Sequence, residues 1–241
     1  MRVLSIGIET YCKVDLSRCG IYRYAEDDSF EVLLFAHSVD GQAVHVVDLA
    51  CGQAVPEAIL DALDDPRVEK WAFNATFEWV CLSRMLHDMG RFNGGCYLNP
   101  AGWRCTMVRA AAAGLPLSLE GAGGAHHIER GKLACGKDLI RYFSQPCAST
   151  KTNGGRTCNL PAHALERWEA FKAYNARDVE AEMELQQRLS GLQPAPSMWD
   201  EYMLDQREST TVASSSTLCS SLAPSKLTPA HARRPRSVCA A

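Results

Sequence analysis

The fold is decided by residues 3–10, which read VLSIGIET. Aliphatic residues occupy the even positions from 4 to 8, while Gly7 and Glu9 occupy odd positions. Because successive side chains of a strand point to opposite faces of a sheet, this alternation predicts a strand with one apolar face. Carboxylates at positions 7 and 9 would project side by side from the other face toward a common metal site, but only Glu9 supplies one.

Strand-like and helix-like segments follow one another along the rest of the chain. Beyond the first strand, the pattern predicts strands at residues 31–39, 43–48 and 69–73, and helices at residues 56–63, 76–89 and 162–189. Residues 104–143 are mostly helical in pattern, but glycine and proline interrupt them, so several short helices are expected there. This order of elements indicates an α/β fold, with a mixed sheet flanked by helices.

Composition and charge narrow the class of protein. The chain has 241 residues and is 46% hydrophobic, which is enough to fill a core.

Residues 209–241 are rich in Ser, Thr, Ala and Pro, and hold four of the 25 basic residues and no acid. We expect a disordered tail there, and a frameshift or a truncated reading frame would explain the abrupt change in composition. Residues 1–208 then carry 21 basic against 28 acidic residues, which suits nucleic acid only if the acids hold divalent metal.

The sequence gives no sign of a membrane protein or a secreted one. No segment approaches the roughly 18 to 20 consecutive apolar residues of a membrane-spanning helix. The first residues run directly into a strand pattern and do not resemble a signal peptide. We therefore expect a cytoplasmic protein that has no membrane partner.

Two further segments carry polar residues at positions typical of a site. Asn74 follows the strand at 69–73, and Glu78 stands in the first turn of the next helix. By itself this pair is ordinary, because asparagine often caps a helix and acids near a helix start complement its dipole. Tyr174 and Asp178 are four residues apart in the last helix, so they share one face. By themselves, Tyr174 and Asp178 could equally be two neighbouring residues on the protein surface.

The last helix carries three more acids, Glu180, Glu182 and Glu184. We expect them on a solvated face. The apolar positions expected to face the core in the same helix are Leu165, Trp168, Phe171, Ala176, Val179, Met183 and Leu189.

Taken together, the order and spacing of these segments resemble the three motifs of the four-carboxylate exonuclease superfamily in its tyrosine-bearing (DEDDy) branch. Other segments are similar in sequence to the amino-terminal region of family A DNA polymerases of phages and prophages. They are SIGIETY at 5–11, CGIY at 19–22, WRCTM at 103–107, LIRYF at 139–143 and KTNGGRT at 151–157. The resemblance covers nearly all of residues 1–208, and residues 199–207 resemble the start of a polymerase region.

The resemblance implies an RNase H-like fold and a 3′–5′ exonuclease-like domain at residues 1–190. Residues 191–208 would begin the connection to a missing polymerase region, and residues 209–241 would be the tail. The implied activity is hydrolysis of DNA at the 3′ end of a single strand by two Mg²⁺ or Mn²⁺ ions. The protein would be encoded by a phage or a bacterium, and its partner would be a polymerase region normally in the same chain.

The resemblance also assigns roles to residues. Glu9 and Asp178 would lie at the metal on the nucleophile side, Tyr174 would orient the attacking water, and Glu78 would help to hold the second metal. Weaker candidates for contacts to the DNA strand are Asn74, Lys151 and Arg156.

Gly7 departs from the family pattern, which has an aspartate at this position. That aspartate is expected to bridge both metals, so we expect an intact fold with impaired catalysis. The alternative is an inactive remnant of the domain that holds single-stranded DNA without cutting it.

A third reading is a zinc module that uses Cys135, Cys147, Cys158 and either His126 or His127. It is disfavoured because the spacing lacks the close cysteine pairs of structural zinc sites.

Overall fold

The computed structural model describes residues 1–91, 97–128, 136–192, 198–199 and 202. The tail expected at residues 209–241 lies outside this part of the chain, and so does most of the connection expected at residues 191–208.

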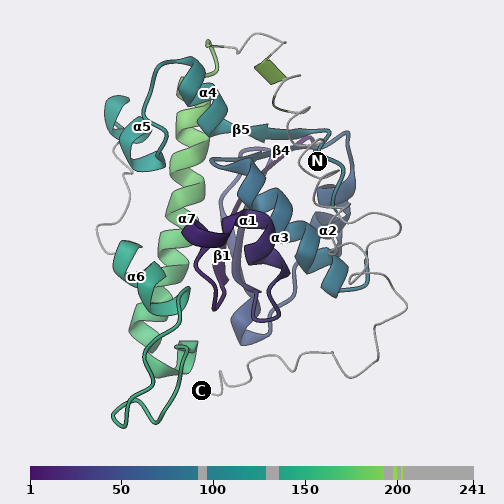
Figure 1. Cartoon of the computed structure of the whole chain (residues 1–241). Coiled ribbons are helices and arrows are strands. Elements are labelled where there is room, and N and C mark those ends of the chain that lie inside the picture. Colours follow the sequence, from purple (N-terminus) through teal and green to yellow (C-terminus); the bar gives the residue numbers. More distant parts are fainter. Residues whose placement is uncertain (92–96, 129–135, 193–197, 200–201, 203–241) are drawn as a thin grey trace.

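A five-stranded mixed sheet forms the centre of the molecule (Figure 1). Its strands are β1 (Val3–Tyr11), β2 (Glu31–Val39), β3 (His45–Asp48), β4 (Glu69–Ala72) and β5 (Trp103–Cys105). They lie in the order β3-β2-β1-β4-β5, with β2 antiparallel to both β1 and β3, and with β4 parallel to both β1 and β5. The structure thus confirms the expected α/β fold, a mixed sheet flanked by helices.

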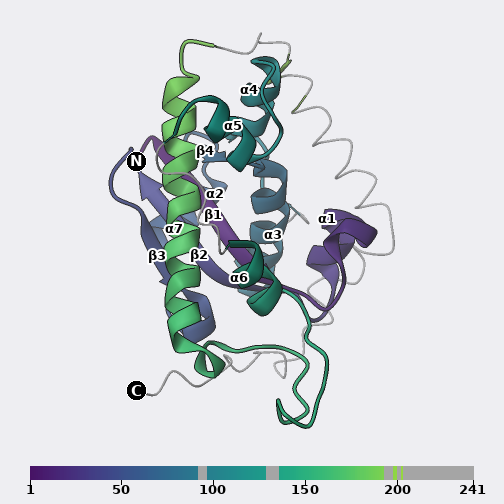
Figure 2. The same ribbon diagram turned by 90° about the vertical axis from the view of Figure 1, so that its left-hand side faces the viewer.

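Seven α-helices surround the sheet in the described part of the chain. They are α1 (Leu16–Glu26), α2 (Glu57–Asp64), α3 (Ala75–Asp88), α4 (Thr106–Ala112), α5 (Leu119–Ala125), α6 (Gly136–Phe143) and α7 (Leu165–Arg188). Two short 3-10 helices lie at Leu49–Cys51 and Pro161–His163. Figures 1 and 2 show α7 along one face of the sheet and α3 on the opposite face.

Strand β1 is covered on both faces, and its alternation decides what each helix contacts. Leu4, Ile6 and Ile8 are buried in the apolar cluster that includes α2 and α3. Gly7 faces the other way, because a Cβ atom at this residue would lie 2.7 Å from the Cγ2 atom of Val179 in α7. The expected apolar face is therefore confirmed, and α7 covers the second face.

An aromatic cluster holds the first half of α7 against the sheet. The Phe143 ring lies 4.8 Å from the Trp168 ring and 5.4 Å from the Phe171 ring, measured between centroids. The indole Nε1 of Trp168 donates a buried hydrogen bond of 2.7 Å to the Oδ2 atom of Asp48, at the end of β3. Apolar burial supplies most of the stabilisation at such a contact, and the hydrogen bond fixes its orientation.

Some sequence-based expectations were wrong in detail. Residues 103–105 form strand β5, where a helical pattern was expected to begin, because three residues are too few to show an alternation. Leu165 was expected in the core, but it is 62% exposed at the first position of α7. Leu185 was not expected there, and it is fully buried. Helix α1 was missed because Gly20 interrupts it with a φ of 73°.

The bond between Trp168 and Asp48 provides a test of this packing. Replacing Asp48 with Ala leaves the buried indole N–H and the Cys51 backbone N–H without their acceptor and removes the ion pair with Lys172, so the free energy of unfolding should fall by about 1–3 kcal/mol. Urea unfolding measures the change. Asp64→Ala removes an exposed acid and is the control, with an expected change within about 0.5 kcal/mol. Equal stabilities for the two variants would show that the bond does not anchor α7.

Candidate active site

The residues of the three motifs come from three elements, β1, α3 and α7. Glu9 lies near the end of β1, Glu78 in the first turn of α3, and Tyr174 and Asp178 within α7. The charge of Asp178 raises the pKa of both Glu78 and Tyr174, and the charge of Glu9 also raises that of Tyr174, each adding to the larger effect of burial. Asp178 is therefore within electrostatic reach of both Glu78 and Tyr174, and Glu9 is within reach of Tyr174.

Tyr174 is held rigidly in a protonated state. It is 1% exposed, and burial raises the pKa of its hydroxyl, with further increases from Asp178 and Glu9. Its side chain is hydrogen-bonded to that of Asp178, one turn further along the helix. The Phe171 ring stacks on one side at 6.3 Å, and Gly136 lies so close that a Cβ atom there would overlap the Tyr174 ring. The site therefore has a fixed hydroxyl beside a carboxylate.

Glu78 is buried although it is an acid. It is 9% exposed, and its Oε2 atom has no hydrogen-bond partner among the described residues. Burial raises the pKa of Glu78 to about 8, and the charges of Glu182 and Asp178 add to this increase. Without a cation nearby, this carboxyl group therefore binds a proton at neutral pH.

Glu182 was expected on a solvated face, and that expectation was wrong. It is 2% exposed, because residues 174, 178 and 182 repeat every four positions on the face of α7 that is turned toward the rest of the domain. Thr106 donates a hydrogen bond from Oγ1 to the Oε1 atom of Glu182. Burial raises the pKa of Glu182 to about 7, while the Thr106 bond and the charge of Arg109 act in the opposite direction. The spacing of four from Asp178 was the signal that could have identified it.

Gly7 lies directly beneath α7. A Cβ atom at Gly7 would be 2.7 Å from Val179 Cγ2 and 3.7 Å from Asn175 Nδ2. The first distance is shorter than real side chains allow, so the space of a carboxylate is filled by Val179. An aspartate at position 7 requires the helix or Val179 to move.

The three candidates for DNA contacts lie at two places. Asn74 is exposed at the start of α3, where its side chain makes no capping hydrogen bond. Lys151 and Arg156 lie in the loop between α6 and α7, which extends away from the sheet near the start of α7 (Figure 1). Lys151 is exposed, whereas Arg156 is half-buried and donates from Nε to Asn159 Oδ1 at 3.0 Å. Arg156 thus also holds the loop together.

The donor chemistry of the site fits a hard divalent cation. Mg²⁺ and Mn²⁺ prefer oxygen ligands, and Mg²⁺ commonly binds through one or two carboxylates and keeps several waters. The buried Glu78 oxygen without a partner, close to two other carboxylates, is the kind of donor that such an ion satisfies. Within the described residues, however, no three His, Cys, Asp or Glu side chains form a group that could hold a metal ion.

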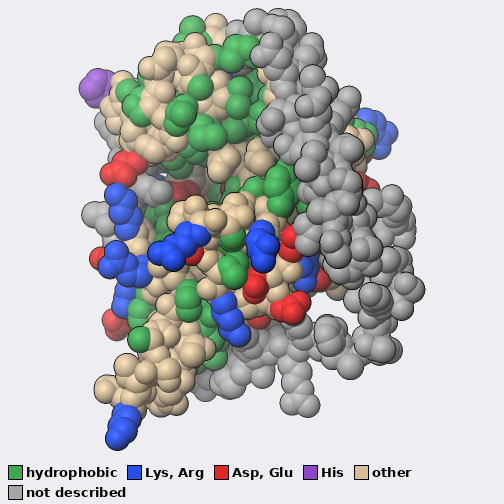
Figure 3. All heavy atoms as spheres, in the orientation of Figure 1, with side chains coloured by type: hydrophobic (Ala, Val, Ile, Leu, Met, Phe, Trp, Pro, Cys, Tyr) green, Lys and Arg blue, Asp and Glu red, His purple; other side chains and the backbone are tan. Residues whose placement is uncertain are grey.

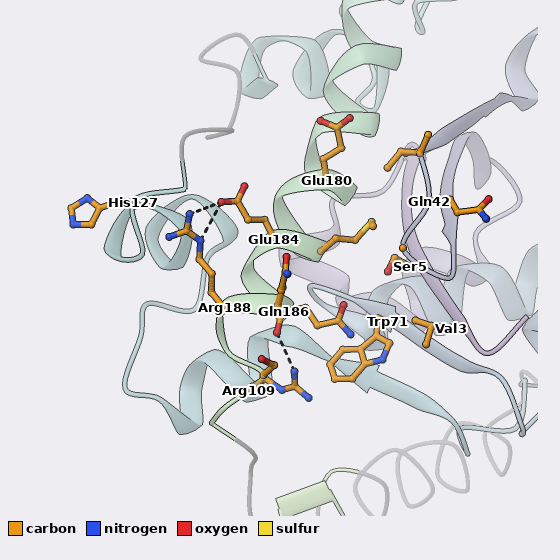
Figure 4. Close-up of a pocket in the computed structure, with 16 residues that line it drawn as sticks. Val3, Ser5, Gln42, Trp71, Arg109, His127, Glu180, Glu184, Gln186 and Arg188 are labelled. Atoms are coloured by element: carbon orange, nitrogen blue, oxygen red, sulfur yellow. Dashed lines mark hydrogen bonds and ion pairs between the residues drawn. The ribbon is translucent and has the colours of Figure 1, made fainter.

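The surface around the site is hollowed and carries both signs of charge. Figure 3 shows apolar side chains over α4 and α5, a hollow with acidic side chains below them, and Lys and Arg side chains lower on the same face. A separate cavity of about 1070 Å³ lies between the start of β1 and the second half of α7. In Figure 4 Trp71 and Gln42 line it, and Arg188 is paired with Glu184 at its edge. The residues of the three motifs do not line this cavity.

Comparison with known proteins identifies a relative over most of the chain. The chain is 44% identical over 206 residues to a DNA polymerase of Bacillus phage SP02, which covers 86% of this chain and 31% of that polymerase. The chain thus spans about a third of the length of its relative. No protein-family model matches it.

A solved structure described as the apo form of a nuclease matches 79% of this chain and 72% of its own, at 16% identity. Its TM-score of 0.40 is too low to establish a shared fold. Among the described helices, none has the length and apolar character needed to cross a membrane.

The buried acids predict how stability depends on pH. A carboxyl group whose pKa is raised in the folded state stabilises the fold fully below about 4.5, and this contribution is lost as the pH rises through the folded pKa. For Glu182 the folded pKa is about 7. The free energy of unfolding should therefore fall between pH 5 and pH 8 in EDTA, measured with urea.

Glu182→Gln should reduce this fall by an amount on the order of 2 kcal/mol, because Gln never ionises and still accepts from Thr106. Glu180→Gln is the control, since Glu180 is partly exposed and pairs with Arg177 at 3.4 Å. Parallel pH curves for wild type and Glu182→Gln would contradict the burial of a carboxyl group at this position.

Proposed function

We propose, because the chain is homologous to part of a phage DNA polymerase, that it is the 3′–5′ exonuclease-type domain of such a polymerase. Its substrate would be the 3′ end of single-stranded DNA, and Gly7 would impair hydrolysis. The observation that supports this best is the electrostatic coupling of Asp178 to both Glu78 and Tyr174, residues of three separate sequence segments. The domain would comprise residues 1–190, and its partner would be a polymerase region normally in the same chain.

In this proposal the acids bind divalent metal ions and the tyrosine orients the attacking water. Glu9, Glu78 and Asp178 would hold Mg²⁺ or Mn²⁺, which when bound activates water and stabilises the charge of the leaving oxygen. Tyr174 keeps its proton because burial and two acids raise its pKa. Its hydroxyl, already hydrogen-bonded to Asp178, could therefore orient the attacking water without acting as a base.

Contacts to the DNA strand would come from the periphery of the site. Asn74 is exposed beside the start of α3, and Lys151 is exposed in the loop before α7. Arg156 is a weaker candidate, because its guanidinium already binds Asn159 and the carbonyl oxygen of Asn153. Phosphate contacts of this kind position a strand without reading its sequence.

The second candidate function is a domain that holds single-stranded DNA without cutting it. The contact between Gly7 and Val179 favours this alternative, since it closes the position of the expected bridging ligand. The two candidates share a fold and a substrate. They differ in whether Mg²⁺ leads to loss of nucleotides from the 3′ end.

A double substitution separates the two. Gly7→Asp restores the expected ligand, and Val179→Ala removes the Cγ2 atom that would overlap it. The double variant should release nucleotides from a 3′-labelled single strand with Mg²⁺ at least on the order of 100 times faster than wild type, as essential-group deletions suggest. Gly7→Asp alone should gain less, because its side chain meets Val179, and Val179→Ala alone should gain nothing.

Fluorescence anisotropy of labelled DNA, with and without Mg²⁺, accompanies the nuclease assay. If the folded double variant binds DNA but shows no gain in cleavage, β1 does not contribute to a metal site. In the double variant, adding Asp178→Asn should return the cleavage rate to the wild-type level or lower. Binding without cleavage in every variant would support the second candidate.

A further inference from the structure

A buried acid that the proposed site does not use lies one helical turn beyond Asp178. Glu182 is almost fully buried, and its Oε2 atom has no hydrogen-bond partner among the described residues. Such an atom is unusual, because buried polar groups in proteins nearly always have a partner. Glu182 is therefore expected to have a ligand that is not a protein side chain.

Among the described residues, Glu182 makes no ion pair with Arg109, a cation that acts on it electrostatically. Arg109 is close enough for its charge to lower the pKa of Glu182. Its guanidinium nevertheless lies over the Trp71 ring at 4.4 Å and donates to the carbonyl oxygen of Gln186 at 3.4 Å. In the described part of the chain no ion pair joins Arg109 to Glu182. A purely structural acid would be expected to take this partner.

Thr106 fixes one oxygen of the carboxylate. Its hydroxyl, at the first residue of α4, donates to Glu182 Oε1 and leaves Oε2 for another partner. Glu78 is another acid with such an atom, since its Oε2 is also buried without a partner among the described residues. The charge of Glu182 acts on Glu78 more strongly than the charge of Asp178 does. Two buried acids from α3 and α7 thus each offer one oxygen in the same region.

We propose that Glu182 and Glu78 together bind one divalent cation, so that Glu182 supplies a carboxylate in place of the one missing at Gly7. Strand β1 cannot supply it, because Val179 fills the space beside Gly7. Two carboxylates with water in the remaining positions are a common way to bind Mg²⁺. This inference rests on the proposed function and adds a residue to its site.

Titration of the full chain with Mn²⁺ at pH 8 tests the proposal, with free Mn²⁺ measured by electron paramagnetic resonance. Glu182→Gln should weaken binding about tenfold or more. Mn²⁺ should also raise the midpoint of thermal unfolding of the wild type and have less effect on this variant. Glu180→Gln is the matched control, because it removes one acid from the same helix at a partly exposed position and should bind as the wild type does.

A second variant keeps the proposal testable if Glu182→Gln does not fold. Thr106→Val removes the hydroxyl that orients Glu182 and keeps the shape of the side chain, so it should weaken Mn²⁺ binding several-fold. Circular dichroism of each variant reports the fold. Wild-type affinity in a folded Glu182→Gln protein, or no Mn²⁺ binding by the wild type, would overturn the proposal.

Asp178→Asn distinguishes this failure from a failure of the proposed function. If Asp178→Asn weakens Mn²⁺ binding and Glu182→Gln does not, Glu182 is not a ligand while the exonuclease-type site remains supported. If neither substitution changes the affinity, the inference and the assigned metal site both fail. The nuclease assay of the Gly7→Asp, Val179→Ala protein tests the proposed function independently of these titrations.

Discussion

Helix α7 lies against the sheet through one face that carries two kinds of side chain. Its first half contributes aromatic residues, and its middle contributes a tyrosine and two acids at a spacing of four. Burying acids costs free energy, so this face is stable only because the aromatic half is well packed and anchored to the end of β3. Strand β1 and helix α4 both contact α7, so the position of α7 also fixes the parts of the candidate site that these two elements carry.

The packing of α7 against the sheet also buries the acids of the candidate site, and burial destabilises their charged forms. The charges of Glu182 and Asp178 raise the pKa of Glu78, and burial raises the pKa of both glutamates. Such groups are common at functional sites, because a protein keeps buried like charges where a ligand compensates them. The aromatic side chains of α7 therefore contribute to stability, and its buried acids are candidates for binding a ligand.

Much of the fold could be predicted from the sequence, because β1 alternates cleanly and the long helices have a clear period. The three motif segments could also be placed, since each one stands at an identifiable junction or helical spacing. Strand β5 could not, because three residues carry no period. Glu182 was misplaced because its charge suggested solvent, although its spacing of four from Asp178 indicated the buried face, where Thr106, 76 residues away in the chain, donates a hydrogen bond to it. The space beside Gly7 could not be foreseen either, since it is set by a residue of a helix far along the chain.

The close approach of Gly7 and Val179 also bears on how such a chain can change over generations. A side chain at position 7 requires Val179 or helix α7 to move, because its Cβ atom would lie 2.7 Å from Val179 Cγ2. Neither residue can change first without a loss of packing on the order of 1–3 kcal/mol. An aspartate at position 7 is therefore accommodated most readily together with a smaller residue at position 179, so substitutions at these two positions are coupled.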